Sequence, residues 1–314
     1  MRHRLIFPTL VFLSPLALCA CGADPAPAIP ADKSSQIQSL AIKPSAGISE
    51  FFDCVDAAGV PLISAHRGGS PENALSGMAA TLTKIAAIPE IDVASLADGT
   101  LVLMHDDTVE RTTNGTGTVA DMSLANFQAL ELDDTDGEAP PLFSDVLAWA
   151  KGKTILQLDL KPSTDYDDVI AMVRQHQAQD RVIFITYTIG QAKLLHRKMP
   201  EAMLSVTIDR QQRLQAFLAT DIPPSNILAW TGTSQPNPKL YKTLDNKGIE
   251  VIFGTLGGSR AIDKQIKSSG NYSQYADIIH QGADIIATDF PQDVAKALQD
   301  SGLTLHAPKC GLGQ

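Results

Sequence analysis

The amino-acid sequence predicts an α/β fold, a (β/α)8 TIM barrel formed by one domain. Short apolar runs of strand length alternate with longer segments of helical periodicity, which is the order of βαβ units in a parallel sheet. Polar clusters directly follow several of these runs, as they do at the carboxyl ends of barrel strands. The chain has 314 residues, and a barrel occupies about 250, so one domain with additional terminal segments accounts for the length.

The apolar runs predict nine strands, because they are short and bounded by turn residues. The predicted strands are Leu62 to Ala65, Glu90 to Val93, Leu101 to Met104, Thr154 to Leu160, Val182 to Tyr187, Leu204 to Ile208, Ile227 to Trp230, Val251 to Phe253 and Asp284 to Ala287. A barrel of this type has eight strands, so one run forms an additional strand. The pattern leaves open which run that is.

Segments of helical periodicity lie between the strands, and one of them begins with the turn chemistry of Pro141. The predicted helices are Asn73 to Ala86, Leu142 to Lys151, Tyr166 to Ala178, Ile189 to Lys198, Arg210 to Ala219, Pro238 to Lys247 and Tyr272 to Gln281. The stretch from Asp106 to Pro140 breaks the alternation. Loops of this length are usually functional or disordered, and its place after a strand predicts a partial lid over the active face.

The N-terminus has the pattern of an export signal. Two arginines precede an apolar run from Leu5 to Leu18 that is short for a membrane span. Leu18-Cys19-Ala20-Cys21 fits a bacterial lipobox, which predicts a signal peptide over residues 1–20 and a lipid on the Cys21 thiol. The alternative is an ordinary signal peptide that is cut at a nearby small residue. By similarity to Gram-negative lipoproteins, Gly22 favours a cell-envelope lipoprotein on the periplasmic side of the outer membrane, with the membrane as a partner.

Residues 21–49 are rich in Ala, Pro and Ser, which predicts a flexible tether before a barrel domain at 50–308 and a C-terminal tail at 309–314. After signal cleavage, Cys54 and Cys310 are the cysteines without an assignment. An exported compartment permits a disulfide between them, and the first and last strands of a barrel are neighbours. The alternative is two free or buried thiols.

Composition excludes two broad classes of protein. A hydrophobic content of 44% is too high for a chain that is disordered throughout. The net charge of −10 argues against a nucleic-acid partner, because phosphate backbones are bound through accumulated Lys and Arg. A small phosphorylated substrate remains compatible, since a local cation or arginine can reverse the field within one pocket.

Three acids predict a metal site. Glu90 and Asp92 alternate along one strand, so both point to the same face, and Asp159 lies near the end of another strand. Carboxylates that face a barrel axis repel one another unless a cation lies between them. An all-oxygen site suits Ca²⁺ or Mg²⁺ better than zinc. For each acid taken singly, the alternative is a cap or a surface residue.

Two histidines and two cations predict phosphate chemistry. His66 and His105 each end a strand-like run, and a pair of groups with pKa values near neutrality suits general acid and general base catalysis. Arg67 and Lys161 are predicted to contact the phosphate. The alternatives are structural histidines and ion pairs between these cations and the three acids.

These residues lie in motifs that resemble the glycerophosphodiester phosphodiesterase family, over about Leu62 to Leu298. The matching segments are Ile63-Ser64-Ala65-His66-Arg67-Gly68, Pro71-Glu72-Asn73, Glu90-Ile91-Asp92-Val93, Asp98-Gly99, Leu101-Val102-Leu103-Met104-His105-Asp106, Arg111-Thr112-Thr113-Asn114-Gly115-Thr116-Gly117, Leu158-Asp159-Leu160-Lys161 and Gly282-Ala283-Asp284-Ile285-Ile286-Ala287-Thr288-Asp289-Phe290-Pro291. The order and spacing of the motifs in the N-terminal half make the resemblance specific.

The resemblance implies a TIM barrel of the phospholipase C-like phosphodiesterase type. It implies hydrolysis of glycerophosphodiesters to an alcohol and sn-glycerol 3-phosphate with a divalent cation. By motif position, His66 and His105 are the acid/base pair, and Arg67, Glu72 and Lys161 surround the substrate. The metal ligands are Glu90, Asp92 and Asp159.

The chain departs from the family pattern at three places. Members usually have Glu where this chain has Asp159, and two motifs are replaced by Phe253-Gly254-Thr255 and Thr186-Tyr187. These changes leave the specificity for the alcohol open. Two other functions remain: a phospholipase of the sphingomyelinase D-like or phosphoinositide type, and a catalytically silent protein that binds phosphorylated ligands. The motifs do not assign which histidine is the acid, whether a cyclic phosphate forms, or the oligomeric state.

Overall fold

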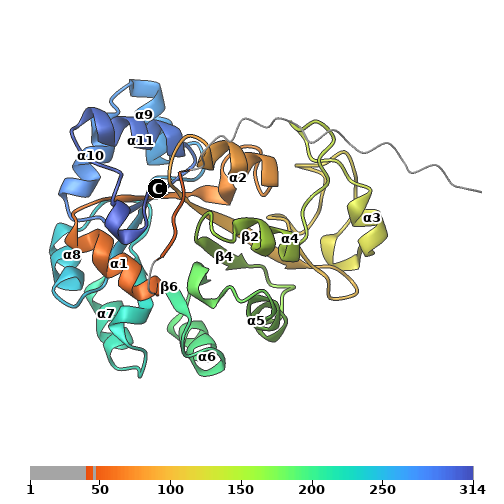
Figure 1. Ribbon diagram of the computed structural model, residues 1–314, viewed down its shortest axis with the longest axis horizontal. Helices are drawn as coiled ribbons and strands as arrows, with labels where there is room; N and C mark the ends of the chain where they lie inside the picture. The colour runs from red at the N-terminus through yellow and green to blue at the C-terminus, as the bar shows by residue number, and fades with distance from the viewer. Residues whose placement is uncertain (1–39, 45–46, 314) are drawn as a thin grey trace, which may run out of the picture. The chain divides into compact units, whose positions relative to one another are not determined.

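The computed structural model describes residues 40–44 and 47–313. The predicted signal peptide, the lipidated Cys21 and most of the predicted tether therefore lie outside the described residues. Within them, eight parallel strands close into a barrel in the order β1-β9-β8-β7-β6-β5-β4-β2, and a pairing of β1 with β2 completes the ring. Helices surround this ring (Figure 1). The predicted (β/α)8 barrel is confirmed.

The barrel strands agree with the predicted runs to within about two residues at each end. They are β1 (Leu62–Ala65), β2 (Ile88–Ser95), β4 (Leu156–Leu160), β5 (Val182–Thr186), β6 (Met203–Thr207), β7 (Ile227–Trp230), β8 (Val251–Gly254) and β9 (Ile285–Thr288). Almost all of their residues are buried, because helices cover the outer face and side chains fill the interior. This is why the strands read as continuous apolar runs.

The additional strand is β3 (Leu101–Leu103), which lies outside the barrel ring. It pairs antiparallel with the end of β2, where Leu103 is opposite Val93 and Leu101 is opposite Ser95. At eight residues, β2 is twice as long as β1, and its last two residues, Ala94 and Ser95, extend past the pairing with β4 and pair with β3 instead. The chain returns along β3 toward the barrel mouth, and the Met104 N–H donates to the Asp92 carbonyl over 3.0 Å.

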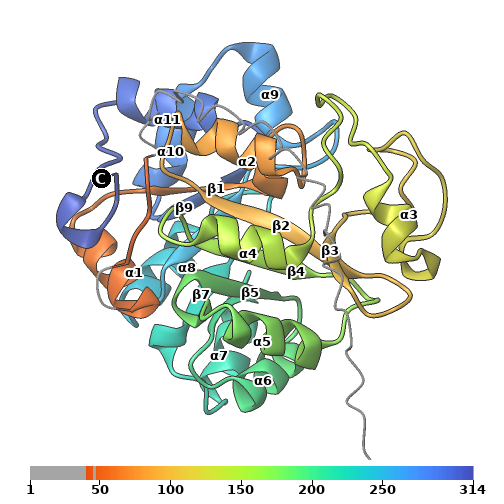
Figure 2. The same cartoon turned by 45° about the vertical axis from the view of Figure 1, so that its right-hand side comes forward.

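This topology corrects the reasoning for His105. The sequence suggested that His105 comes to the mouth at the carboxyl end of a barrel strand. It arrives instead on an antiparallel return strand, because β3 runs opposite to its neighbour. Figure 2 shows β2 and β3 side by side, with the segment around α3 (Leu124–Gln128) beyond them.

The helices overlap all seven predicted ones, and the prediction missed α1, α3, α9 and α11. The helices between the strands are α2 (Leu75–Leu82), α4 (Phe143–Ala150), α5 (Tyr166–Gln175), α6 (Ile189–Lys198), α7 (Gln211–Leu218), α8 (Pro238–Asp245), α9 (Ile262–Ser269) and α10 (Ser273–His280), and α11 (Pro291–Asp300) follows the last strand. Short segments of 3-10 helix follow β1 at His66–Gly68 and directly precede β5 and β7. Of the predicted helices, Ile189 to Lys198 matches α6 without any difference.

The amino end of the barrel is closed by α1 (Ile48–Ala57) and residues 40–44, which we call the amino-end plug. Ile48, Phe51, Phe52 and Val55 form the buried stripe of α1 at helical spacing. The stripe packs on side chains at the starts of the barrel strands: Leu62, Ile88, Ile155, Ile183, Met203, Leu228, Ile252 and Ile285. The helix begins inside the predicted tether, because the tether was delimited by its Pro content and not by this apolar spacing.

The C-terminal segment is fastened to the plug. A disulfide joins Cys54 of α1 to Cys310, and their Cα atoms are 5.7 Å apart. Lys43 N–H donates to the Gly311 carbonyl over 2.8 Å, and Gly313 N–H donates to the Ala41 carbonyl over 2.9 Å. Gly311 has φ +86°, and a Cβ there would lie 1.8 Å from the Lys43 carbonyl oxygen, so the close approach requires glycine.

The stretch from Asp106 to Pro140 folds on the extension of β2 and β3. It contains α3 and a separate apolar cluster that includes Val109, Val119, Met122, Phe127 and Leu130. The cluster also takes Val102 and Met104 from β3 and its end. The segment is therefore anchored by its own small core on the mouth side of the barrel. Its role as a lid stays a prediction.

Candidate active site

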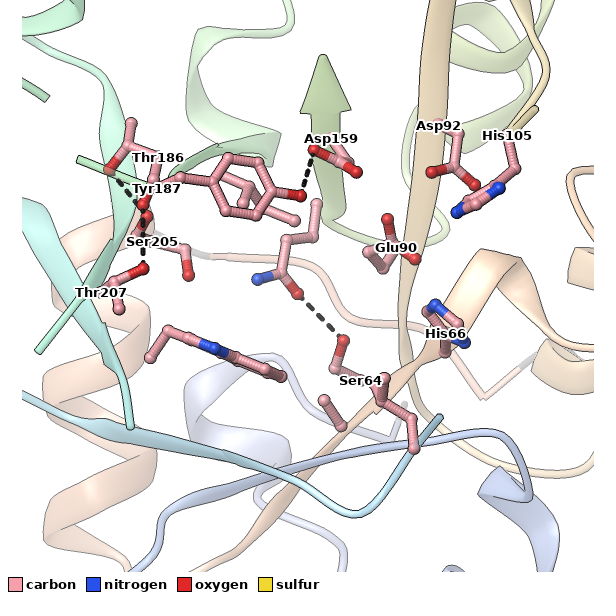
Figure 3. Close-up of a pocket in the computed structure, with 15 residues that line it drawn as sticks. Ser64, His66, Glu90, Asp92, His105, Asp159, Thr186, Tyr187, Ser205 and Thr207 are labelled. Atoms are coloured by element: carbon pink, nitrogen blue, oxygen red, sulfur yellow. Dashed lines mark hydrogen bonds between the residues drawn. The ribbon is translucent and has the colours of Figure 1, made fainter. Parts of the chain in front are cut away.

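A cavity of about 210 Å³ opens at the carboxyl ends of the barrel strands. Figure 3 shows that side chains from β1, β2 and β4 to β6 face this space. The lining residues are Ser64, His66, Glu90, Asp92, His105, Gln157, Asp159, Ile185, Thr186, Tyr187, Ser205, Thr207, Trp230, Leu256 and Ala287. The predicted histidines and acids thus share one cavity, although up to 93 residues separate them in the sequence.

The three predicted metal ligands come together on two neighbouring strands. Asp92 of β2 is in register with Asp159 of β4, and Glu90 lies two residues earlier on β2. One carboxylate oxygen of each lies within 4.8 Å of the others. All three residues are buried, Glu90 and Asp159 at 8% exposure and Asp92 at 1%. Among the described residues, this is the group of acids that is arranged to hold a cation.

Like charge and burial both act on Glu90. Burial raises the pKa of Glu90 to about 8, and the charge on Asp92 adds to the effect. The backbone N–H of Arg67 donates to Glu90 Oε2 over 2.8 Å and orients the carboxylate. Anionic oxygens gathered at this spacing, in a buried position, form a donor set that fits a hard divalent cation.

Neutral and cationic neighbours fix the other two acids. Asn73 donates through Nδ2 to Asp92 Oδ2 over 2.7 Å, and its Oδ1 accepts the Asp92 backbone N–H over 3.0 Å. Lys161 Nζ lies 2.5 Å from Asp92 Oδ1 and 2.8 Å from Asp159 Oδ2. The Tyr187 hydroxyl donates to Asp159 Oδ1 over 2.8 Å. Lys161, predicted to contact phosphate, thus bridges two of the acids.

His66 follows β1 and is held by a carboxylate from the last strand. Its Nδ1 lies 2.7 Å from Oδ1 of Asp289, which directly follows β9. Burial alone would lower the pKa of His66, but the hydrogen bond to Asp289 and the charge on Glu90 raise it above the ordinary value. Because Nδ1 is engaged and His66 lines the cavity, the other ring nitrogen, Nε2, is the one left for a reaction there.

His105 also contacts a carboxylate through Nδ1, but this carboxylate comes from the adjacent residue and not from a distant strand. Its Nδ1 lies 2.6 Å from Oδ1 of the next residue, Asp106. Asp106 in turn accepts from Arg111, with Nε 2.5 Å from Oδ2. The hydrogen bond from Arg111 lowers the pKa of Asp106 to about 2. Both histidines thus have Nδ1 occupied and Nε2 left for chemistry.

Arg67 and Glu72 lie at the rim of the cavity. Arg67 Nη1 is 3.0 Å from both oxygens of Glu72, and Arg111 donates to the same carboxylate over 2.7 and 3.0 Å. A second hollow of about 500 Å³ lies beside His66 and contains both arginines together with Lys264. The cations predicted to contact the phosphate are therefore at the site, and each is paired with an acid there.

Known proteins place this arrangement in a family. Residues 66–293 match the glycerophosphoryl diester phosphodiesterase family, which is most of the chain. The chain belongs to this family. It is 30% identical over 263 residues to a glycerophosphodiester phosphodiesterase from Caldanaerobacter subterraneus subsp. tengcongensis, covering 77% of this chain and 99% of the relative.

Solved structures agree with this assignment to the glycerophosphodiester phosphodiesterases. A glycerophosphoryl diester phosphodiesterase from Parabacteroides distasonis has a TM-score of 0.76 at 30% identity, with 86% of this chain and 96% of that chain covered. A phosphodiesterase from Oleispira antarctica, solved with its product sn-glycerol-3-phosphate, shares the fold at a TM-score of 0.61 and 22% identity, with 77% and 98% covered. This chain is therefore a phosphoric diester hydrolase, and its family produces glycerol 3-phosphate.

Five site residues received no role from the sequence: Asn73, Asp106, Arg111, Tyr187 and Asp289. A signal existed for Asp289, since it directly follows an apolar run and precedes Phe290 and Pro291, as a strand-end residue before a helix does. Asp106 stands next to a predicted catalytic histidine. Arg111 contacts Asp106, five residues away, but its other partner, Glu72, is 39 residues away, and Asp159 is 28 residues from Tyr187. The local sequence therefore shows neither the contact of Arg111 with Glu72 nor that of Tyr187 with Asp159.

Proposed function

We propose that this phosphodiesterase hydrolyses glycerophosphodiesters to an alcohol and sn-glycerol 3-phosphate at the cavity, with Ca²⁺ or Mg²⁺ held by Glu90, Asp92 and Asp159. One observation carries the proposal. Two histidines with carboxylate-bound Nδ1 atoms line the same cavity as three buried acids whose oxygens lie within 4.8 Å of one another. A substrate bound in this cavity can therefore contact the general acid, the general base and the cation at the same time.

The residues present fit a divalent cation. The three acids supply oxygen ligands, which hard cations prefer, and they are buried close together, where a cation would offset the repulsion between them. When bound, the cation would neutralise charge on the phosphoryl oxygens and polarise the phosphoryl group. Asn73, Lys161 and Tyr187 orient two of the acids toward this position.

The histidines move the protons in this proposal. One Nε2 removes a proton from the attacking oxygen, and the other protonates the oxygen of the departing alcohol. Their partners Asp289 and Asp106 keep the proton on Nδ1, so that Nε2 faces the reaction. Arg67 and Lys161 supply positive charge for the phosphate.

The residues that line the cavity support the proposal that it binds a small polyol such as glycerol. Ser64, Gln157, Ser205 and Thr207 offer neutral hydrogen-bonding groups, and Trp230 adds an aromatic side chain to the lining. Uncharged donors and acceptors of this kind suit the two hydroxyls of a glycerol moiety. The product bound to the Oleispira antarctica phosphodiesterase has the same chemistry.

The test uses protein that begins at Ala23, with glycerophosphocholine, glycerophosphoethanolamine and a chromogenic bis-aryl phosphodiester as substrates. We expect release of glycerol 3-phosphate that stops in chelator and returns with Ca²⁺ or Mg²⁺. Phosphorus NMR during turnover shows whether a cyclic phosphate accumulates. Faster hydrolysis of intact lysophospholipid or phosphoinositide micelles would establish the phospholipase instead. Binding of phosphodiesters without turnover would establish the silent binding protein.

We also propose that the enzyme is an exported lipoprotein with lipid on Cys21, on the periplasmic side of the outer membrane. The lipobox and the apolar run before it support this proposal. None of the helices in the described residues is long and apolar enough to span a bilayer. Metabolic labelling with a palmitate analogue and fractionation of the envelope test the proposal. Protein that takes up no label, or that fractionates identically after Cys21→Ala, would refute lipidation.

A further inference from the structure

Asp263 is a buried carboxylate outside the catalytic cavity. It lies in the first turn of α9, and its exposed fraction is 0%. A carboxylate is costly to bury unless hydrogen bonds replace its water, and the N-terminus of a helix favours its negative charge. Here neutral groups supply the hydrogen bonds. Tyr275 donates to Oδ1 over 2.8 Å, and the Thr288 hydroxyl donates to Oδ2 over 2.9 Å.

A third hydrogen bond connects Asp263 with the end of β9. The backbone N–H of Asp289 donates to Asp263 Oδ2 over 2.8 Å. The Thr288 hydroxyl, which donates to the same oxygen, also accepts the Phe290 N–H over 2.9 Å. One carboxylate thereby fixes the backbone from Thr288 to Phe290, at the place where β9 reaches the mouth of the barrel.

The side chain of Asp289 then has a defined direction. Its Oδ1 lies 2.7 Å from His66 Nδ1, and its Oδ2 accepts the Gly257 N–H over 3.1 Å. Two donors from different elements hold the two oxygens. A carboxylate accepts but does not donate, so this contact keeps a proton on His66 Nδ1 and leaves Nε2 for the substrate.

We propose that Asp263 is a positioning residue for His66 and acts through Asp289. The proposal rests on the acid/base role of His66 in the proposed function. Asp263 of α9 accepts the backbone N–H of Asp289, and the Asp289 carboxylate in turn contacts the His66 imidazole. His105 has no such buried support in its dyad, since its partner Asp106 is held by Arg111 at the rim. The two histidines are therefore oriented by independent structures.

The experiment compares variants by the ¹⁵N chemical shifts of the His66 ring, by turnover and by calorimetric Ca²⁺ or Mg²⁺ affinity. Asp263→Ala removes the acceptor of the Asp289 N–H. Asp263→Asn is the conservative variant, because its amide oxygen can accept from Thr288 and Asp289 while its NH₂ group faces the Tyr275 hydroxyl. Tyr275→Phe is the matched control, since it removes a buried hydrogen bond of the same carboxylate on the side away from Asp289.

In Asp263→Ala we expect His66 to lose the pure Nδ1–H tautomer and turnover to fall about 100-fold, as for misplaced catalytic groups. Cation affinity should stay within about twofold, because Glu90, Asp92 and Asp159 are untouched. Asp263→Asn and Tyr275→Phe should keep both the tautomer and the turnover of the wild type. If Asp263→Ala does not fold, Asp263→Ala combined with Tyr275→Phe, which leaves no unpaired tyrosine hydroxyl, is measured by the same criteria.

The proposal is overturned if the folded alanine variant keeps the Nδ1–H tautomer of His66 and turns over within about twofold of the wild type. It is also overturned if Tyr275→Phe shifts the His66 tautomer as strongly as Asp263→Ala does. The shift would then come from a general loosening of the structure around Asp263 and not from the loss of its contact with Asp289. The NMR result does not depend on catalysis. A wild type without phosphodiesterase activity but with the expected tautomer shift would refute the proposed function and leave the positioning role intact.

Discussion

His66 and His105 differ in what else contacts the carboxylate that each of them faces. Asp289 has hydrogen bonds from His66 and from a backbone N–H, whereas Asp106 also pairs with the full positive charge of Arg111. Burial alone would raise the pKa of Asp289, but these hydrogen bonds lower it. Each partner is therefore an anion at neutral pH, and each keeps its imidazole in the orientation that exposes Nε2.

Replacement of either histidine should stop catalysis without removing the cation. His66→Ala and His105→Ala should each lower turnover on glycerophosphocholine by about two to four orders of magnitude, because each removes a proton-transfer group. On a nitrophenyl ester, whose leaving group needs little protonation, the loss should shrink for the acid and persist for the base. Steady-state kinetics on both substrates checks this and assigns the two roles.

The control for this pair is His280→Ala, which changes an exposed histidine at the end of α10. It should leave turnover on both substrates unchanged. Calorimetry on all three variants should give the cation affinity of the wild type. Near-normal turnover of His66→Ala and His105→Ala on both substrates would place the chemistry elsewhere in the barrel.

At the scale of elements, the β2–β3 ribbon and the segment after it form a unit that delivers His105. The ribbon is held to the barrel mouth by Arg111, which pairs with Glu72 before α2 and with Asp106 beside the histidine. Although burial alone would raise the pKa of Glu72, its hydrogen bonds and charge pairing with Arg111 and Arg67 lower it. A guanidinium can contact two carboxylates at once through its planar fork, and a lysine ammonium cannot do so with the same geometry.

Arg111→Lys should therefore loosen the segment while keeping its charge. We expect faster hydrogen exchange over residues 106–140 and turnover lowered about tenfold, since the catalytic group is less well placed. Exchange mass spectrometry with and without substrate analogue measures the first effect. Arg197→Lys on the exposed side of α6 is the control and should change neither quantity. Unchanged exchange in Arg111→Lys would show that the apolar cluster around Phe127 holds the segment alone.

A second element-scale feature is a group of acids at the amino ends of β8 and β9. Burial raises the pKa of Glu250 to about 8 and the pKa of Asp284 to about 7, and Asp56 of the plug adds to both shifts. Asp284 Oδ2 accepts the Val251 N–H over 2.7 Å. In the unfolded chain such carboxyls have a pKa near 4, so the folded state binds more protons than the unfolded state between about pH 4 and 8.

Stability should consequently fall as pH rises through this window. The stabilising effect of the bound protons is fully present below about pH 4 and lost above about pH 8. Glu250→Gln, which stays neutral, should raise the melting temperature relative to the wild type at pH 8.5 by about 2–4 °C and have little effect at pH 5. Calorimetric melts at both pH values check this. Glu201→Gln, at an exposed ion pair, is the control. An equal gain at both pH values would contradict the titration.

At the scale of the whole described domain, the Cys54–Cys310 disulfide and the backbone pairs at Lys43 and Gly311 fasten both ends of the fold to the amino-end plug. The bridge spans a sequence separation of 256 residues. Chain-entropy reasoning gives about 5 kcal/mol for such a loop, an upper figure, because residual structure in the unfolded state reduces it.

Removing the bridge should lower the free energy of unfolding without affecting the active site. Cys54→Ser with Cys310→Ser should lower the urea midpoint, and the wild type in reductant should behave in the same way. Turnover at 25 °C should be unchanged, because the plug lies at the opposite end of the barrel from the cavity. Equal urea midpoints with and without the bridge would show that hydrogen bonds and apolar packing already fix the ends.

The barrel and much of the site could be predicted because their signals are local. Buried parallel strands are continuous apolar runs, and polar residues at or just after their carboxyl ends mark the catalytic mouth, as at Asp159 and His66. The spacing of Glu90 and Asp92 alone put both acids on one face of a strand. The missed α1 also had a local signal, since its apolar residues repeat at helical spacing, but the Pro-rich sequence before it obscured the boundary.

The sequence by itself determined the (β/α)8 barrel, the family and the identity of the acids and histidines. Only the tertiary structure decided that the third run pairs outside the barrel, that Asp289 orients His66, and that Asp263 holds Asp289. The reason is the separation in sequence between the residues that interact. Periodicity and strand-end chemistry are properties of neighbouring residues, whereas His66 and Asp289 are 223 positions apart and meet because closure of the barrel makes β1 and β9 neighbours.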